Sequence, residues 1–309
     1  MNAGTELLIG LGAAGAWGVS AYLAALASRQ FGGWVTNIGL VAASLVVLVP
    51  MLGIGLGGAL AIASPIDIAV LAVLGLATML LNVVLFQLLA TGPVAVLYPI
   101  LSANAAVVTV LAIVVLREQL LPLQAVAIVL VTGGVIAIAT GSPPASDAPG
   151  LDLRAGPARG EGTVARDASR RAIAIGVFVT VTAGVVLFLS AVYAKQLGWY
   201  QPVLIERVTQ GFVIAAGLAV GLPARANLLG HARGRWFVLA AAGALDGIAV
   251  ALYNLGNEVG STAITATVAS TFAVIPVVLA IVLLGERPRP RQVAGGLTVL
   301  AGILTLAIA

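Results

Sequence analysis

Ten apolar runs of about 20 residues make up most of this chain, and short polar segments separate most of the runs. A helix of that length crosses the hydrocarbon core of a bilayer. The chain is 61% hydrophobic and only 8% charged, with a mean hydropathy of +1.15, so it has too few charged groups to cover a water-facing surface. We therefore expect an all-α integral membrane protein with ten transmembrane helices, at residues 6–28, 35–57, 66–90, 94–116, 120–141, 171–194, 201–222, 236–256, 261–284 and 290–309.

The segment between the fifth and sixth runs, residues 142–170, has a different composition. It is rich in Pro, Gly, Ala and charged residues and contains few large apolar side chains. Such a segment cannot bury a core, which predicts a flexible linker. It divides the chain into a first five-helix repeat at residues 1–141 and a second at residues 171–309.

The last two runs of each half share a pattern that recurs at a spacing of 168 residues, from Gly92–Gly134 to Gly260–Gly302. The polar matches carry most weight in so apolar a chain, and they form a repeated Glu-x-x-x-Pro-x-Gln: Glu118, Pro122 and Gln124 against Glu286, Pro290 and Gln292. Two halves of five helices in series must cross the membrane with opposite orientations. This predicts the inverted-repeat architecture of secondary transporters, with a site near the midplane.

The motif sequences resemble the drug/metabolite transporter superfamily, EamA type. The matching stretches are LREQLLPLQ and VTGGVIAI in the first half, and LLGERPRPRQ and LTVLAGILTL in the second. The first motif departs from the pattern by having Arg117 in place of glycine. The resemblance covers the membrane region but not the linker. It implies export of small metabolites, often amino acids, through a central cavity lined by helices one to four and six to nine.

The basic residues predict the orientation. Most of the fifteen Lys and Arg residues lie in loops on the linker side of the predicted helices. The positive-inside rule then places the linker in the cytoplasm and both termini outside the inner (plasma) membrane. This differs from typical members of the resembled superfamily, whose termini are cytoplasmic.

Three ionisable residues lie well inside predicted helices, where each costs about 2.5–3.5 kcal/mol on insertion scales. Asp246 is the deepest, and it either binds a substrate amine or a proton, or forms a structural ion pair with Arg207. Arg207 alternatively binds a substrate carboxylate. Glu206 is about 100° around the helix from Arg207, and we expect it to face the headgroups.

Neutral polar residues supply the other candidates. Tyr98 and Ser102 share one helix face, and so do Thr267 and Ser270, at nearly equivalent positions of the repeat. For any one of these residues, hydrogen bonding between helices is the better explanation, whereas the set as a whole is better explained by a shared midplane site. Trp17 lies midway along the first helix, where it faces either the cavity or a packing neighbour. The predicted substrate-binding residues are Trp17, Asn82, Tyr98, Ser102, Arg207, Asp246, Tyr253, Thr267 and Ser270.

The repeated acids Glu118 and Glu286 are not assigned to this site. Each precedes a helix by a few residues, so we expect a structural cap at the membrane surface, where a carboxylate complements the helix N-terminus.

Together these features favour a secondary exporter of small metabolites, such as amino acids or amphipathic drugs, that works by alternating access. The alternatives are a membrane-embedded lipid-modifying enzyme and a passive channel or facilitator. No histidine-based, acid-rich or nucleophile motif and no cysteine is present, so we expect no catalytic residues, metal or cofactor. The expected partners are a small-molecule substrate and the lipid bilayer, with no nucleic acid, in a monomer or homodimer.

Overall fold

The computed structural model describes residues 3–57, 59–91, 102–141, 162–220, 236–276, 278–279 and 290–309. These residues are mainly helical and contain no strand. The elements are α1 (Ala3–Phe31), α2 (Gly33–Leu48), η1 (Val49–Met51), α3 (Leu52–Gly57), α4 (Pro65–Thr91), α6 (Asn104–Val114), α7 (Pro122–Gly141), α8 (Gly162–Leu197), α9 (Tyr200–Ala219), α11 (Trp236–Val259), α12 (Thr262–Ser270), η3 (Thr271–Ala273) and α14 (Pro290–Ile308).

The lengths and compositions of these helices indicate a multi-pass membrane protein. Seven spans are long and apolar enough to cross a bilayer: Gly4–Phe31, Gly33–Met51, Pro65–Ala90, Phe178–Leu197, Tyr200–Ala219, Trp236–Val259 and Pro290–Ile308. Three shorter apolar helices, at Asn104–Val114, Pro122–Ile138 and Thr262–Pro276, lie within the other predicted runs. Parts of two of these runs, including residues 92–101, lie outside the described residues.

Two departures from the predicted helix boundaries change the description of the chain. The predicted helix at 35–57 is divided into α2, η1 and α3, with Pro50 in the 3₁₀ turn. Proline lacks an N–H donor and its ring clashes with the preceding turn, so the α-helix ends there. The sixth helix, α8, begins at Gly162, so residues 162–170 of the predicted linker belong to it.

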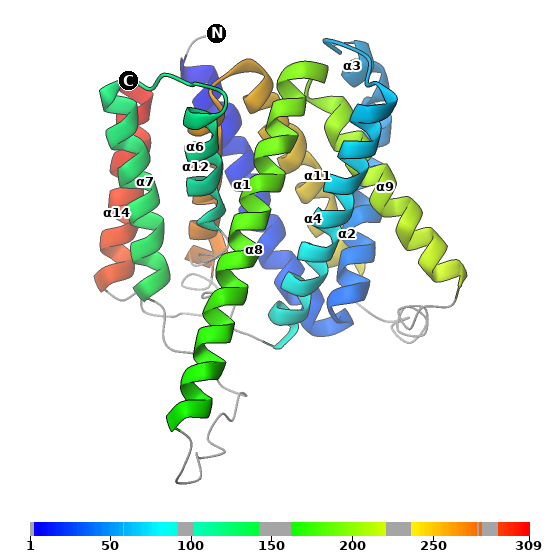
Figure 1. The fold of residues 1–309 in the computed structure, drawn as a ribbon, viewed down its shortest axis with the longest axis horizontal. Coiled ribbons are helices and arrows are strands. Elements are labelled where there is room, and N and C mark those ends of the chain that lie inside the picture. The colour runs from blue at the N-terminus through cyan, green and yellow to red at the C-terminus, as the bar shows by residue number, and fades with distance from the viewer. Residues whose placement is uncertain are drawn as a thin grey trace.

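The two halves of the chain interleave in the bundle. Both termini lie at one end (Figure 1), which we call the termini side, and the opposite end is the linker side. Helices of the first half contact helices of the second throughout: α1 and α2 pack on α11, α4 on α9, α6 on α12, and α7 on α14. The interior of the bundle is therefore an interface between the halves.

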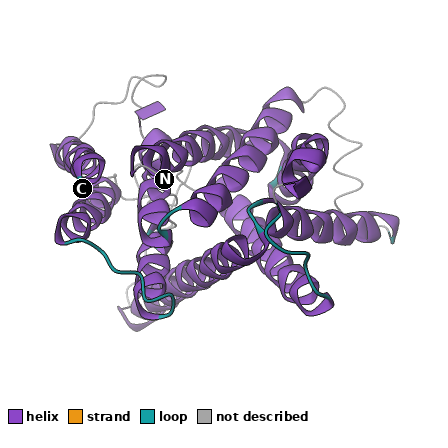
Figure 2. Ribbon diagram, turned by 90° about the horizontal axis from the view of Figure 1, so that it is seen from above, coloured by secondary structure: helices purple, strands orange, loops and turns teal. Residues whose placement is uncertain are grey.

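Helices α7 and α14 form a pair beside the other helices (Figures 1 and 2). Glycines allow this pair to pack with backbones in contact. A Cβ added to Gly134 would lie 2.7 Å from the carbonyl oxygen of Gly295, and one added to Gly302 would lie 3.0 Å from the carbonyl oxygen of Ala127. Gly134, Gly295 and Gly302 thus have a packing role within one chain.

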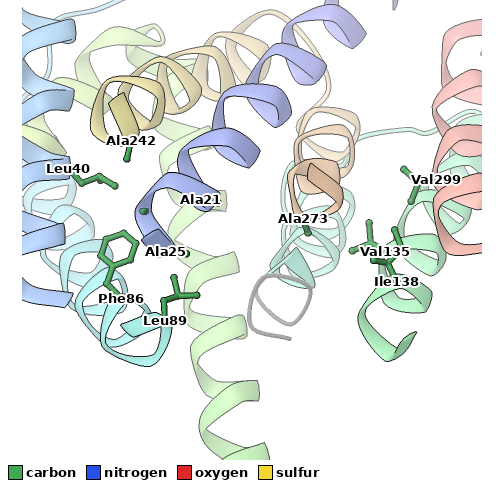
Figure 3. Close-up of a cluster of buried hydrophobic side chains, with 11 residues drawn as sticks. Ala21, Ala25, Leu40, Phe86, Leu89, Val135, Ile138, Ala242, Ala273 and Val299 are labelled. Atoms are coloured by element: carbon green, nitrogen blue, oxygen red, sulfur yellow. The ribbon is translucent and has the colours of Figure 1, made fainter. Parts of the chain in front are cut away.

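A buried apolar cluster connects this pair to the rest of the bundle (Figure 3). It joins Val135 of α7 and Val299 of α14 to Ala21 of α1 and Phe86 of α4. Small residues let helices approach closely, and van der Waals packing is a main source of helix association in a bilayer. Phe86 also borders the cavity described next.

Candidate substrate cavity

A cavity of about 180 Å³ lies between the two halves. Its walls come from α1, α2, α4 and α6 of the first half, and from α8, α9, α11, α12 and η3 of the second. None of the described residues of α7 or α14 lines it. The volume has room for on the order of ten water molecules, which suits a small metabolite.

A buried ion pair forms the polar centre of this cavity. The Arg207 guanidinium donates through Nη2 to the Asp246 carboxylate and through Nη1 to Gln210 Oε1 at 3.2 Å. Gln210 Nε2 donates in turn to the Gly75 carbonyl at 3.0 Å. The indole N–H of Trp17 donates to the other Asp246 oxygen at 3.3 Å. The network joins α9, α11, α4 and α1, and it satisfies both charges of the pair.

Glu206 also lines the cavity, which corrects the expectation that it faces the headgroups. Its side chain is buried, with 7% of the residue exposed. Helix α9 packs against α2, α4, α8 and α11, so more than one of its faces is covered. Adjacent charged residues can therefore both point inward, although they are about 100° apart around the helix.

The Glu206 carboxyl group is only partly satisfied. The Ser190 hydroxyl of α8 is a hydrogen-bond partner. Its Oε1 atom has no partner among the described residues. A buried carboxylate oxygen without a partner is costly, and such groups are expected to serve a ligand or a proton.

Aromatic side chains form one wall. The Trp17 ring lies with its centroid 5.3 Å from that of Tyr253 and 6.2 Å from that of Phe272. All three residues line the cavity. Edge and tilted arrangements at these separations are favourable for aromatic pairs.

The other predicted residues lie in different places. Asn82 and Ser270 line the cavity. Thr267 does not: it is fully buried, its hydroxyl donates to the Ala263 carbonyl at 2.8 Å, and it lies 3.3 Å from the Thr109 hydroxyl of α6. Ser102 is buried outside the cavity lining, and Tyr98 lies outside the described residues. Thr267 thus has the helix-bridging role that the sequence left open.

Several polar residues besides Glu206 line the cavity without having been predicted as site residues, among them Ser20 and Ser190. The sequence contains a signal that could have identified both residues, because Ser20-Ala21 aligns with Ser190-Ala191 in a looser continuation of the repeat. Ser20 donates to the Ala242 carbonyl at 2.8 Å, and Ser190 lies 3.4 Å from Asn254 Oδ1.

On the termini side, Glu118 joins the two halves. Its carboxylate accepts hydrogen bonds from the backbone N–H of Thr262 and Ala263, at 2.8 and 3.0 Å, and from the Ser261 hydroxyl at 2.8 Å. Glu118 therefore caps α12 of the other half. This corrects the expectation from the sequence, which was a cap on the helix that follows Glu118. At the start of α7, Gln124 Oε1 accepts from the Leu121 N–H at 3.0 Å.

Two further charged residues complete this contact. Lys195 Nζ lies 3.7 Å from Glu118 and donates to the Gly260 carbonyl at 2.6 Å, and Glu6 accepts from the Ser261 N–H at 2.8 Å. We call Glu6, Glu118, Lys195 and residues 260–263 the termini-side cluster. Burial raises the pKa of Glu118, but the hydrogen bonds from Ala263, Thr262 and Ser261 and the Lys195 charge outweigh it, so the pKa is below its ordinary value.

Two other contacts between the halves lie nearby. The Tyr200 hydroxyl donates to the Leu48 carbonyl at 2.9 Å, and the Ala63 N–H donates to Gln201 Oε1 at 3.1 Å. Hydrogen bonds therefore join the two halves on the termini side of the bundle.

A polar cavity at the centre of a multi-pass helical bundle is typical of a membrane transport protein. Residues 170–308 match the EamA-like transporter family. This confirms the resemblance to the drug/metabolite transporter superfamily. Members of the family are transporters and not enzymes.

A solved structure supports the fold over the whole chain. The crystal structure of a protein 15% identical to this chain superposes with a TM-score of 0.66, covering 98% of each chain. At this identity the similarity concerns the fold alone. A comparison with curated proteins gave no match.

Proposed function

We propose that this protein is a secondary transporter that exports small metabolites by alternating access. The observation that carries the proposal is the position of the cavity between the two halves, with polar and charged groups from both. If the halves rock against each other, such a cavity changes the side to which it opens without any change in its lining.

The contacts between α7 and α14 support an inverted repeat. A shift of 168 residues maps Gly134 onto Gly302, Ala127 onto Gly295, and Val131 onto Val299. A Cβ on Gly134 would meet the Gly295 carbonyl oxygen and the Val299 N, and one on Gly302 would meet the Ala127 carbonyl oxygen and the Val131 N. The two contacts are therefore images of each other, as a two-fold axis between the halves requires.

The connections between helices follow the same symmetry. The turn from α1 to α2 contains Gly32 with φ 79°, and the turn from α8 to α9 contains Gly198 with φ 88°. Both turns occupy the same place in their half, after its first helix. These similarities favour ten membrane helices arranged as two inverted repeats of five.

The contacts at the termini side support alternating access. The termini-side cluster bonds the halves at that end, whereas many lining residues, such as Ala24 and Phe86, lie toward the linker-side ends of α1 and α4. With the linker in the cytoplasm, as the basic residues favour, the closed end faces outward from the plasma membrane. The structure then corresponds to an inward-facing state.

Transport in proteoliposomes tests the proposal. Purified protein is reconstituted, and a panel of labelled small amines and amino acids is screened by counterflow and by uptake under an imposed pH gradient. A transporter accumulates substrate against its gradient, and a passive channel only equilibrates it. Flux that never exceeds equilibration would contradict active transport, and the absence of any protein-dependent flux would contradict the transport function itself.

A further inference from the structure

The cavity contains one carboxylate more than it has cationic groups. Among the described residues that line it, the charged ones are Glu206, Arg207 and Asp246. Arg207 and Asp246 neutralise each other as a bonded pair. The Glu206 charge is therefore without a counter-charge, and one of its oxygens is without a hydrogen-bond partner among the described residues.

We propose that Glu206 binds the ammonium group of a small amine with an apolar body. The inference rests on the proposed function and names its substrate class. Glu206 lacks a counter-charge and a hydrogen-bond donor for one oxygen, and an ammonium group supplies both. A charge-assisted hydrogen bond of this kind is about twice as strong as a neutral one. Burial excludes water from the pair and strengthens the attraction further.

The aromatic wall suits the rest of such a ligand. Trp17, Tyr253 and Phe272 line the same cavity, and the Trp17 ring lies beside the other two. Aromatic faces pack against an apolar body, and they also attract a cation. A small arylalkylamine matches the cavity in charge and in surface.

The same geometry disfavours a free amino acid. A substrate carboxylate needs a cationic donor, and the charge of Arg207 is already neutralised by Asp246, with a second N–H directed at Gln210. The ammonium group of a zwitterion would neutralise Glu206, but its carboxylate would then be an uncompensated negative charge in the cavity that contains Asp246. The cavity selects amines that lack a carboxylate.

A proton is the natural competitor for the same oxygen. Of the groups that line the cavity with Glu206, α11 contributes Asp246 and Tyr253, and α9 contributes Arg207, whereas the lining residues of α2, α4, α6 and α8 are uncharged. Protonated Glu206 cannot attract an ammonium group, so amine binding weakens as the pH falls. Loss of this pH dependence is expected when Glu206 is replaced by glutamine.

Binding to purified protein in detergent tests the inference separately from transport. Four ligands of similar shape are titrated calorimetrically: 2-phenylethylamine, its neutral analogue 2-phenylethanol, phenylalanine, and the anion 3-phenylpropionate. The wild-type protein should prefer the amine. In Glu206→Gln the affinity for the amine should fall by roughly tenfold to a hundredfold, the effect of losing a hydrogen bond to a charged group, while binding of the alcohol stays unchanged.

Two controls separate charge from folding. Glu206→Asp keeps the charge and should retain part of the amine preference, and unchanged binding of the alcohol by Glu206→Gln reports an intact cavity. Equal amine affinity in wild type and Glu206→Gln, or a wild-type preference for phenylalanine or the anion, overturns the inference. Glu206-dependent amine binding without flux in liposomes supports the inference and contradicts the transport function.

Discussion

The Glu118 carboxylate, at the end of the first half's apolar repeat, accepts a hydrogen bond from the backbone N–H of Ala263 at 3.0 Å, in the first turn of α12. The bond crosses between the two halves of the chain. It gives the repeated acid a role in joining the halves at one end of the bundle.

Replacing Glu118 by alanine should open this end. The change removes the acceptor of three hydrogen bonds and the partner of Lys195. We expect a loss of about 2 kcal/mol in the free energy of unfolding, because hydrogen bonds to a charged group are lost. Thermal unfolding in detergent measures this loss.

The Glu118→Ala variant should also increase the access of a reagent on the termini side to the cavity. The chain contains no cysteine, so Ala266→Cys in the cavity wall is the only thiol to label. A membrane-impermeant maleimide added on the termini side should label it faster when Glu118 is also alanine. Equal labelling rates in both backgrounds would show that the termini-side cluster does not control access.

Acid should weaken the cluster in a defined pH window. The pKa of Glu118 is lowered from its ordinary value of 4.5, so the unfolded protein binds the proton more readily than the folded one. The stabilisation is complete above pH 4.5 and is lost as the pH falls through the lowered pKa. The difference in melting temperature between wild type and Glu118→Gln should be constant near neutral pH and shrink below that value. A difference that grows with acid would contradict the assignment.

The Arg207–Asp246 pair should be sensitive to removal of one partner. Asp246→Asn leaves a buried guanidinium without a counter-charge, and we expect a loss of about 3 kcal/mol in the free energy of unfolding. The double variant Asp246→Asn, Arg207→Gln should regain much of that loss, because both charges are then absent. Denaturation of the single and double variants gives the coupling energy by a double-mutant cycle. Strictly additive losses would mean that the two side chains do not interact.

Neighbouring glycines of α7 should respond in opposite directions to alanine. A Cβ at Gly134 would overlap the α14 backbone, whereas one at Gly133 would meet nothing within 4 Å. Gly134→Ala should lower stability by about 1–3 kcal/mol through overpacking. Gly133→Ala should be neutral or raise it by up to about 1 kcal/mol through helix propensity.

The repeat extends this comparison to the second half. Gly302→Ala should be destabilising like Gly134→Ala, and Gly296, which has open space, should tolerate alanine like Gly133. Melting temperatures of the four single variants provide the comparison. A stable Gly302→Ala protein would falsify the two-fold equivalence of the packing.

Arg117 should gain stability on replacement by glycine. Its φ of 56° lies in the left-handed region, which costs an L-residue about 1–2 kcal/mol. Glycine adopts this conformation without that cost, although it gives back part of the gain through the flexibility of the unfolded chain. We expect a net increase of about 0.5 kcal/mol in the free energy of unfolding, with Arg117→Ala as the control that keeps the strain. No difference between the two variants would mean that the turn relaxes.

The helices could be predicted from the sequence because apolar length is a local property. Every predicted run contains a described helix, and the ends moved mainly where a local feature intervened, such as Pro50 in the second run. The interaction partners of the charged residues were harder to predict from the sequence. Asp246 and Arg207 were recognised as a candidate pair because few other charges lie within the predicted helices.

Glu206 and Glu118 required the three-dimensional arrangement. The inward direction of Glu206 depends on how many helices surround α9, which no spacing along α9 records. Glu118 lies next to the helix that follows it in sequence, but its bonding partners are 144 and 145 residues further along the chain. The tertiary fold therefore places the Glu118 carboxylate at the N-terminus of α12 and not at the N-terminus of the nearest helix in sequence, α7.

The cap on α12 has an implication for how such proteins vary. Two of the groups that Glu118 binds are backbone amides of Thr262 and Ala263, which every amino acid except proline provides. Side-chain changes at those two positions therefore leave both donors in place, so these two hydrogen bonds leave no side-chain record at the start of α12. Homologues with unrelated residues at positions 262 and 263 can retain these two bonds, and comparison of Glu118 with those two positions for covariation would not detect them.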